Sequence, residues 1–135
     1  MRRCEQSDVP EVLALWGQAR SGHASTSDRV DDVESLVADS PAALLVAERD
    51  GEIVGALIAA WDGWRGNMYR LAVRDECRRE GIGLALTRAG EEYLRRCGVR
   101  RVTALVAVGD EGAAGFWESA GYPVDREIGR RVRNL

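Results

Sequence analysis

The chain has 135 residues, 45% of them hydrophobic and 30% charged, which is enough for one globular domain with a core and excludes a disordered chain. Its basic residues are 19 arginines with no lysine, and its formal net charge is -3, which excludes a general attraction to nucleic acid or to an anionic membrane. We therefore expect a single domain over residues 1–135 that has no nucleic-acid or membrane partner.

The N-terminal part of the chain is predicted to form a short strand followed by two helices. Asp8 has the position of an N-cap, and the apolar residues after it recur at helical spacing through Trp16. A polar loop follows over residues 21–27. A second helical pattern over residues 30–37 stops before Pro41, because the residue before a proline disfavours the helical conformation.

The middle of the chain is predicted to form three strands. Residues 43–48 and 53–61 are apolar runs that flank the turn at residues 49–52, the pattern of a hairpin. A second turn over residues 62–67 leads into a third strand over residues 68–73. Because these strands follow one another through short turns, we expect them to pair in one sheet.

The last third of the chain alternates between helix and strand. Residues 82–97 carry one apolar face at helical spacing, and residues 102–108 have the composition of a buried strand. Asp110 is predicted to cap a short helix that Gly121 closes. Residues 124–132 alternate weakly and are predicted to supply one or two final strands. The order β-α-α-β-β-β-α-β-α-β predicts a mixed α/β sheet.

The cysteine count bears on the compartment and on metal binding. Cys4, Cys77 and Cys97 are an odd number without CxxC spacing, so we expect no disulfide framework. His23 is the only histidine that could join them, so we expect no metal site. The chain begins without an apolar leader, and its longest apolar run, residues 53–61, is too short to span a bilayer as a helix. These features predict a reduced, cytoplasmic protein.

The junction between the strand at residues 68–73 and the long helix is the most informative stretch. The first amides of a helix have no internal partners and carry partial positive charge. Gly81 and Gly83 remove β-carbons that would block an approaching anion, and Arg78 and Arg79 add positive charge. This junction fits a pyrophosphate, although two glycines before a helix also suit a plain tight turn.

Two other phosphate-binding loops are excluded. A dinucleotide fingerprint needs a third glycine where this chain has Leu86, and a P-loop needs a lysine, which the chain lacks. The pattern that is present, Arg78-x-x-Gly81-x-Gly83, resembles the Arg/Gln-x-x-Gly-x-Gly/Ala signature of the GNAT superfamily of N-acetyltransferases.

The resemblance covers nearly the whole chain in the family's order. Residues 47–55 resemble the hairpin between the family's second and third strands, and residues 109–122 resemble its late strand-helix segment. The turn at residues 61–66, with Tyr69 after it, is similar to a group of small stand-alone bacterial members. The resemblance implies an α/β (α+β) fold with a mixed, mostly antiparallel sheet of about six or seven strands flanked by about four helices.

The resemblance also implies an activity and a set of coenzyme-binding residues. The implied enzyme moves an acetyl group from acetyl-CoA to a primary amine, on a small molecule or a peptide N-terminus, by direct attack in a ternary complex. Backbone groups of residues 71–73 would meet the pantetheine arm and the acetyl carbonyl, and main-chain amides of residues 79–84 would bind the pyrophosphate. The predicted coenzyme contacts are Leu71, Ala72, Val73, Arg78, Arg79, Glu80, Gly81, Ile82, Gly83, Leu84, Asp110 and Trp117.

The residues expected to transfer protons depart from the family's pattern. A tyrosine in the family's late helix corresponds to Trp117, whose indole donates a hydrogen bond but cannot act as an acid. A glutamate that some members use as a base corresponds to Asn67. Three alternatives stay open. The thiolate leaves with only a hydrogen bond, Tyr122 or Tyr69 supplies the proton, or the fold is a weak or inactive acyl-CoA-binding module.

Two further residues are candidates on the acceptor side. His23 lies in the loop at residues 21–29, where the family usually admits the acceptor, and is a candidate base. Asp62 is a candidate contact for the amine, with turn formation as the plainer role. Trp117 is likewise a candidate catalytic residue whose competing role is core packing. Because many relatives pair, a homodimer is a possible assembly.

Overall fold

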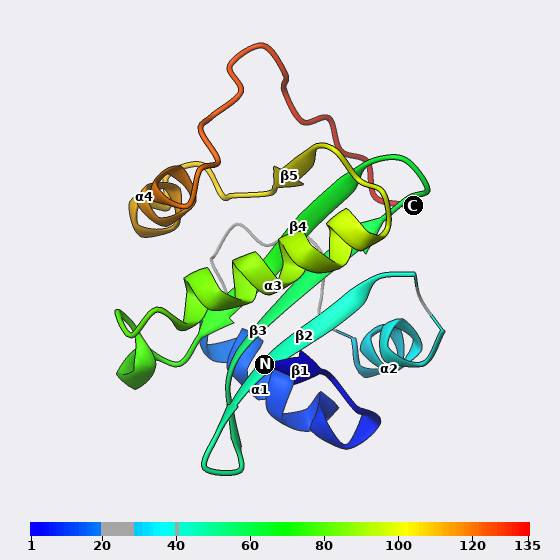
Figure 1. Ribbon diagram of the computed structural model, residues 1–135, viewed down its shortest axis with the longest axis vertical. Helices are drawn as coiled ribbons and strands as arrows, with labels where there is room; N and C mark the ends of the chain where they lie inside the picture. Colours follow the sequence, from blue (N-terminus) through cyan, green and yellow to red (C-terminus); the bar gives the residue numbers. More distant parts are fainter. Residues whose placement is uncertain (20–28, 40) are drawn as a thin grey trace.

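The computed structural model describes residues 1–19, 29–39 and 41–135 and contains a five-stranded sheet (Figure 1). Strands β1 to β4 pair antiparallel in chain order, and β5 joins β4 in parallel. The strands are β1 (Arg2–Arg3), β2 (Ala43–Arg49), β3 (Glu52–Trp61), β4 (Gly66–Val73) and β5 (Val102–Ala104).

Helices cover both faces of the sheet. One apolar cluster joins α1 and α2 to one face, and a second joins α3 and α4 to the other, where α3 crosses in front of the strands (Figure 1). The expected mixed, mostly antiparallel sheet flanked by four α-helices is thereby confirmed. The helices are α1 (Val9–Ala19), α2 (Val30–Asp39), α3 (Ile82–Arg96) and α4 (Glu111–Ser119), with short 3-10 helices η1 (Gln6–Asp8) and η2 (Asp75–Cys77).

The central strand β3 packs closely against α3. Residues 53–59 of β3 are all buried, because the sheet is covered on both faces at this point. At Gly55 an added β-carbon would lie 2.9 Å from Cδ1 of Leu86 and 3.0 Å from Cγ2 of Ile82. Glycine at this position therefore lets α3 approach the strand closely.

We expect Gly55→Ala to lower the free energy of unfolding by about 2 kcal/mol, because the added methyl group overpacks a filled core. Urea unfolding at neutral pH would measure the change. Gly115→Ala is the matched control, since no atom lies within 4 Å of the β-carbon position at Gly115 in α4. The control is expected to be neutral or slightly stabilising. Equal stabilities of the two variants would contradict the packing argument.

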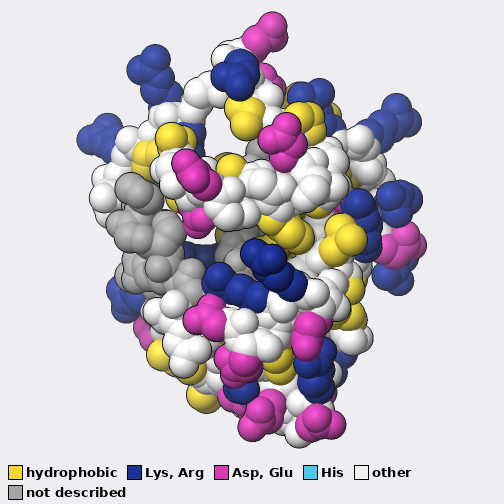
Figure 2. Space-filling model, turned by 90° about the vertical axis from the view of Figure 1, so that its left-hand side faces the viewer, with side chains coloured by type: hydrophobic (Ala, Val, Ile, Leu, Met, Phe, Trp, Pro, Cys, Tyr) yellow, Lys and Arg dark blue, Asp and Glu magenta, His cyan; other side chains and the backbone are white. Residues whose placement is uncertain are grey.

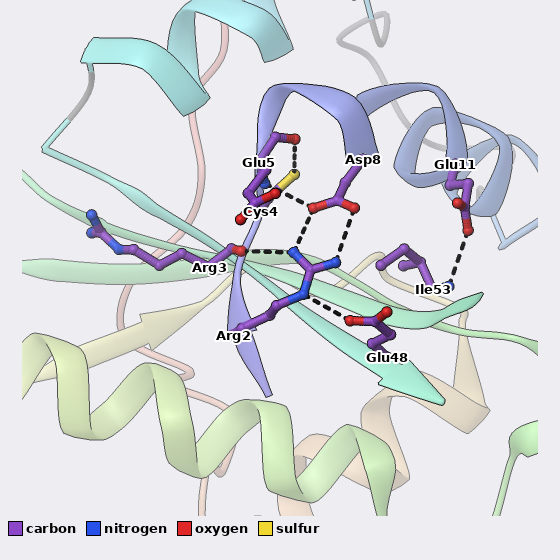
Figure 3. A network of polar contacts seen from close by, with 8 residues as sticks. All are labelled: Arg2, Arg3, Cys4, Glu5, Asp8, Glu11, Glu48 and Ile53. Atoms are coloured by element: carbon purple, nitrogen blue, oxygen red, sulfur yellow. Dashed lines mark hydrogen bonds and ion pairs between the residues drawn. The ribbon is translucent and has the colours of Figure 1, made fainter. Parts of the chain in front are cut away.

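A charged network ties the N-terminal strand to η1 and β2 (Figure 3). The guanidinium of Arg2 donates to both oxygens of Asp8, at 2.6 and 3.0 Å, and to Glu48 at 2.9 Å. The same Asp8 carboxylate accepts the amide of Glu5 at 2.8 Å. Because Asp8 is only 8% exposed, these donors replace the water that its carboxylate loses on folding.

The C-terminal part of the chain differs from the expectation. The predicted strand over residues 102–108 forms only at residues 102–104, and no strand forms in residues 124–132, so the sheet has five strands rather than six or seven. After α4 the chain arches away from the sheet (Figure 1). In a strand, Val124, Ile128 and Val132 would share one face with Arg126 and Arg130, and the two arginines would prevent that face from being buried.

Candidate functional site

Strands β4 and β5 diverge shortly after they meet. Their pairing covers residues 66–68 of β4, and the amide of Leu105 also donates to the carbonyl oxygen of Met68 at 3.2 Å. Within the described ranges, no residue of β5 pairs with β4 beyond this point, although β4 continues to Val73. The predicted pantetheine contacts, residues 71–73, lie in this diverging part of β4.

A β-bulge lies at the start of the divergence. The register between β3 and β4 shifts by one residue, so that Arg70 and Leu71 of β4 stand opposite Leu57 of β3. Arg70 has a φ of 57°, in the left-handed region that non-glycine residues rarely adopt. Bulges of this kind break the regular ladder and redirect backbone groups.

Sequence reasoning missed one contact at this bulge. The indole N–H of Trp16 in α1 donates to the carbonyl oxygen of Arg70 at 2.9 Å. The helical pattern gave Trp16 only a core role, which it also has. The partners are 54 residues apart, so no local pattern of residues could have indicated the bond.

The N-terminus of α3 follows β4 by one loop and is open to an anion. Its N-cap, Gly81, has a φ of 83° and offers no side chain to the first amides of the helix. No atom lies within 4 Å of the β-carbon position at Gly81. Arg79 in the same loop has a φ of 63°. Exposed amides and the helix dipole at such a terminus favour a bound phosphate.

Ion pairs brace the loop between β4 and α3. Glu80 accepts from Arg49 of β2 at 2.7 Å, and Arg78 pairs with Asp75 at 3.1 Å. The negative charge of Glu80 is therefore offset within the protein by Arg49. Figure 2 shows this side of the molecule, with a group of arginine side chains near its centre beside a hollow in the surface.

Helix α4 supplies the aromatic residues of the site. Asp110 caps it as expected, its carboxylate accepting the amide of Ala113 at 3.0 Å. Trp117 is 5% exposed and packs edge-on against Phe116 and Tyr122, with ring centroids 5.3 and 5.1 Å apart. Trp117 is thus a core residue, and its predicted contact with the coenzyme stays a prediction.

The two tyrosines considered as proton donors lie in different surroundings. The hydroxyl of Tyr122 donates to Glu91 of α3 at 2.9 Å. Burial, and after it this bond to Glu91, raises the pKa of Tyr122 above its usual range. Tyr69 packs on the opposite side of the sheet, against the α1 cluster, where burial raises its pKa. Both hydroxyls therefore stay protonated at neutral pH.

The acceptor candidates divide into one that the structure describes and one that it does not. Asp62 accepts the amides of Trp64 at 2.9 Å and of Arg65 at 2.7 Å, and its pKa is lowered first by the bond from Arg65 and then by that from Trp64. These bonds give Asp62 the turn-forming role. His23 lies outside the described residues, with most of its loop.

Residues 1–19, 29–39 and 41–135 contain no cluster of three or more His, Cys, Asp or Glu side chains placed to bind a metal ion. None of the helices in these ranges has both the length and the apolar character needed to cross a membrane.

Comparison with known proteins gives consistent matches. The model of the acetyltransferase (GNAT) family matches residues 9–122. Acetyltransferase YE1169 of Yersinia enterocolitica is 31% identical over 134 residues, which cover 98% of this chain and 94% of that protein.

Solved acetyltransferases share the fold. The apo aminoglycoside antibiotic 6'-N-acetyltransferase AAC(6')-IG from Acinetobacter haemolyticus has a TM-score of 0.82 at 16% identity, covering 99% of this chain and 97% of that chain. AAC(6')-Iy, in complex with the bisubstrate analogue CoA-S-monomethyl-acetylneamine, has a TM-score of 0.76 at 20% identity, covering 98% and 97%. Because the family model spans most of the chain, and a relative of nearly the same length is 31% identical, this protein belongs to the acetyltransferase (GNAT) family.

Proposed function

We propose that this acetyltransferase uses acetyl-CoA as its donor and a primary amine as its acceptor, and that residues 1–135 act as one domain. The observation that carries the proposal is the placement of the β4 bulge, where β4 leaves β5, on the strand whose following loop leads to the uncapped N-terminus of α3. An extended backbone edge followed by an anion-binding terminus suits a ligand with an amide-rich arm and a diphosphate. A cytoplasmic location and a homodimer stay predictions.

The residues of the loop fit the diphosphate of coenzyme A. The space beside Gly81 is empty where a β-carbon would stand, so phosphate oxygens can reach the amides of residues 81–84. Arg79 is exposed in the same loop and adds charge. The backbone of residues 71–73 would bind the pantetheine arm. Asp110 already accepts the amide of Ala113, so a coenzyme contact would use its remaining acceptor capacity.

The chemistry needs an acyl donor and two proton movements. When bound, acetyl-CoA supplies a thioester whose carbonyl carbon the amine nitrogen attacks, so that a C–N bond forms and the C–S bond breaks. The amine's proton passes to solvent, and the departing thiolate takes up a proton from solvent. The protein's part is to orient the groups and to stabilise the negative charge that develops on the carbonyl oxygen. The bond of Tyr122 to Glu91 favours a structural role for Tyr122, and Asp62 has its turn to support. We therefore favour departure of the thiolate with only hydrogen-bond assistance.

The acceptor is proposed to be a cationic small molecule or a peptide N-terminus. One structural relative is named as an aminoglycoside antibiotic 6'-N-acetyltransferase, and another was solved with a bisubstrate analogue that joins coenzyme A to acetylneamine, which supports a small-molecule amine as acceptor. The exposed Asp31 and Asp32 at the start of α2 would suit a cationic guest near the acceptor side. Their other role is to complement the dipole of α2.

Release of free thiol from acetyl-CoA tests the proposal. We expect release that depends on added amine, across a panel of aminoglycosides, polyamines, amino acids and peptides. Calorimetry with coenzyme A would be run beside it. Coenzyme binding without turnover on any amine would support the alternative, an acyl-CoA-binding module. Absence of both would contradict the proposal.

The hypothesis that a weak or absent activity reflects the missing acid at residue 117 makes a distinct prediction at Trp117. If proton donation to the leaving thiolate is limiting, Trp117→Tyr should raise kcat at least about threefold by supplying an acid. The smaller ring leaves space between Phe116 and Tyr122, so the free energy of unfolding should fall by about 1–2 kcal/mol. Steady-state rates and urea unfolding would measure both. Trp117→Phe is the control, since it makes a similar cavity without a hydroxyl. Equal rates in the two variants would contradict the acid-limited view.

A further inference from the structure

The peptide unit between Arg70 and Leu71 is oriented by a side chain on the opposite face of the sheet from α3. Its carbonyl oxygen accepts the indole N–H of Trp16 at 2.9 Å, and Trp16 is 3% exposed in the α1 cluster. In a regular strand that carbonyl would lie in the plane of the sheet and bond to a neighbouring strand. The bulge instead turns it toward α1.

The direction of the C=O bond of a peptide unit fixes the direction of its N–H bond. In a planar trans peptide the C=O and N–H bonds point in opposite directions. With the Arg70 carbonyl directed toward α1, the N–H of Leu71 is directed away from α1, toward the face that α3 and α4 cover. Leu71 lies where β4 leaves β5, which is the stretch proposed to meet the acetyl carbonyl.

We propose that Trp16 is a positioning residue: by donating to the Arg70 carbonyl oxygen, its indole N–H aims the Leu71 amide at the acetyl carbonyl oxygen. This inference rests on the proposed function. An amide fixed before the reaction stabilises the developing negative charge without reorganising. The left-handed Arg70 needs such a restraint, because a non-glycine residue leaves this conformation unless its surroundings impose it.

The matched pair of variants is Trp16→Phe and Leu15→Ala. Trp16→Phe keeps an aromatic ring in the α1 cluster and removes the N–H donor. Leu15 is buried on the same helix, and its aliphatic side chain has no donor for the Arg70 carbonyl, so its truncation weakens α1 packing without removing that hydrogen bond. A purely structural role for Trp16 would make both variants lose stability and neither lose kcat well below the melting temperature.

We expect Trp16→Phe to lower kcat at least about fivefold while KM for acetyl-CoA changes less than about twofold, since the lost effect belongs to the transition state. Leu15→Ala should keep the wild-type kcat. If Trp16→Phe keeps a kcat within about twofold of wild type, the inference is overturned.

A readout besides activity comes from the indole N–H resonances of 15N-tryptophan-labelled protein. We expect the Trp16 resonance to shift on saturation with coenzyme A and to shift further with acetyl-CoA, because polarisation of the Leu71 amide is transmitted to the Arg70 carbonyl. Trp64, 77% exposed in the turn after β3, is the reference resonance. Binding of coenzyme A without a shift of the Trp16 resonance would overturn this inference and would leave the proposed function unaffected. Failure of coenzyme to bind would overturn the proposed function and the inference together.

Discussion

Gly83→Asp is expected to weaken coenzyme A binding at least about tenfold. A β-carbon at Gly83 would lie 3.3 Å from Cε2 of Phe116 and 3.7 Å from Cγ2 of Val73, so the side chain has no free space toward α4. Its carboxylate would compete with the diphosphate for the first amides of α3 and would repel it. Because an aspartate in a first turn suits the helix dipole, the variant should stay folded.

Calorimetric titration with coenzyme A measures the effect, and two variants separate its causes. Gly83→Ala adds only the β-carbon and should weaken binding less than Gly83→Asp. Gly17→Asp adds the same charge on α1, where no atom lies within 4 Å of the β-carbon position, and should leave affinity unchanged. An unchanged affinity in Gly83→Asp would mean that the phosphates bind elsewhere.

Asp8→Ala is expected to lower the free energy of unfolding by about 1.5–3 kcal/mol at pH 7, the typical range for a hydrogen bond to a charged group. The substitution removes the acceptor of two bonds from Arg2 and of the Glu5 amide (Figure 3). Glu48 would still pair with Arg2, which limits the loss. Urea unfolding of wild type and variant gives the difference. A loss below about 0.5 kcal/mol would show that the network contributes little.

The pH dependence of this difference follows from the pKa of Asp8. The hydrogen bonds from Arg2 lower that pKa below its usual value, with a further contribution from the Glu5 amide. A carboxyl whose folded pKa lies below its unfolded value of about 3.9 contributes stability above that value and loses it as the pH falls through the folded pKa. The stability gap between wild type and Asp8→Ala should therefore be constant from about pH 5 to 8 and shrink below about pH 4. A gap independent of pH down to about 2 would contradict this assignment.

Elements governed by short-range chemistry were predictable from the sequence. The turn between β2 and β3 formed at Asp50 and Gly51, which both have positive φ, as hairpin turns require. Asp110 caps α4 as predicted, because an aspartate three residues before a free amide satisfies it locally. The strand, loop and helix around Gly81 followed from the same kind of local pattern, and with them the family.

Features that depend on contacts between distant residues were not predictable. The bulge at Arg70 depends on the register of β3 against β4 and on a tryptophan from α1. Neither can be predicted from the residues next to Arg70 in the sequence. The bond of Tyr122 to Glu91 joins the segment that follows α4 to α3 and could not be inferred from spacing. The prediction of final strands over residues 124–132 was wrong, because a weak alternation of apolar and polar residues does not show whether one face of a strand can be buried.

The account depends on a diphosphate bound at the start of α3, and a crystal structure with coenzyme A tests that most directly. We expect the phosphate oxygens within hydrogen-bond distance of main-chain amides in residues 79–84, with the pantetheine arm along residues 71–73. Phosphates bound away from this loop, or an arm that does not follow β4 where it leaves β5, would contradict the account.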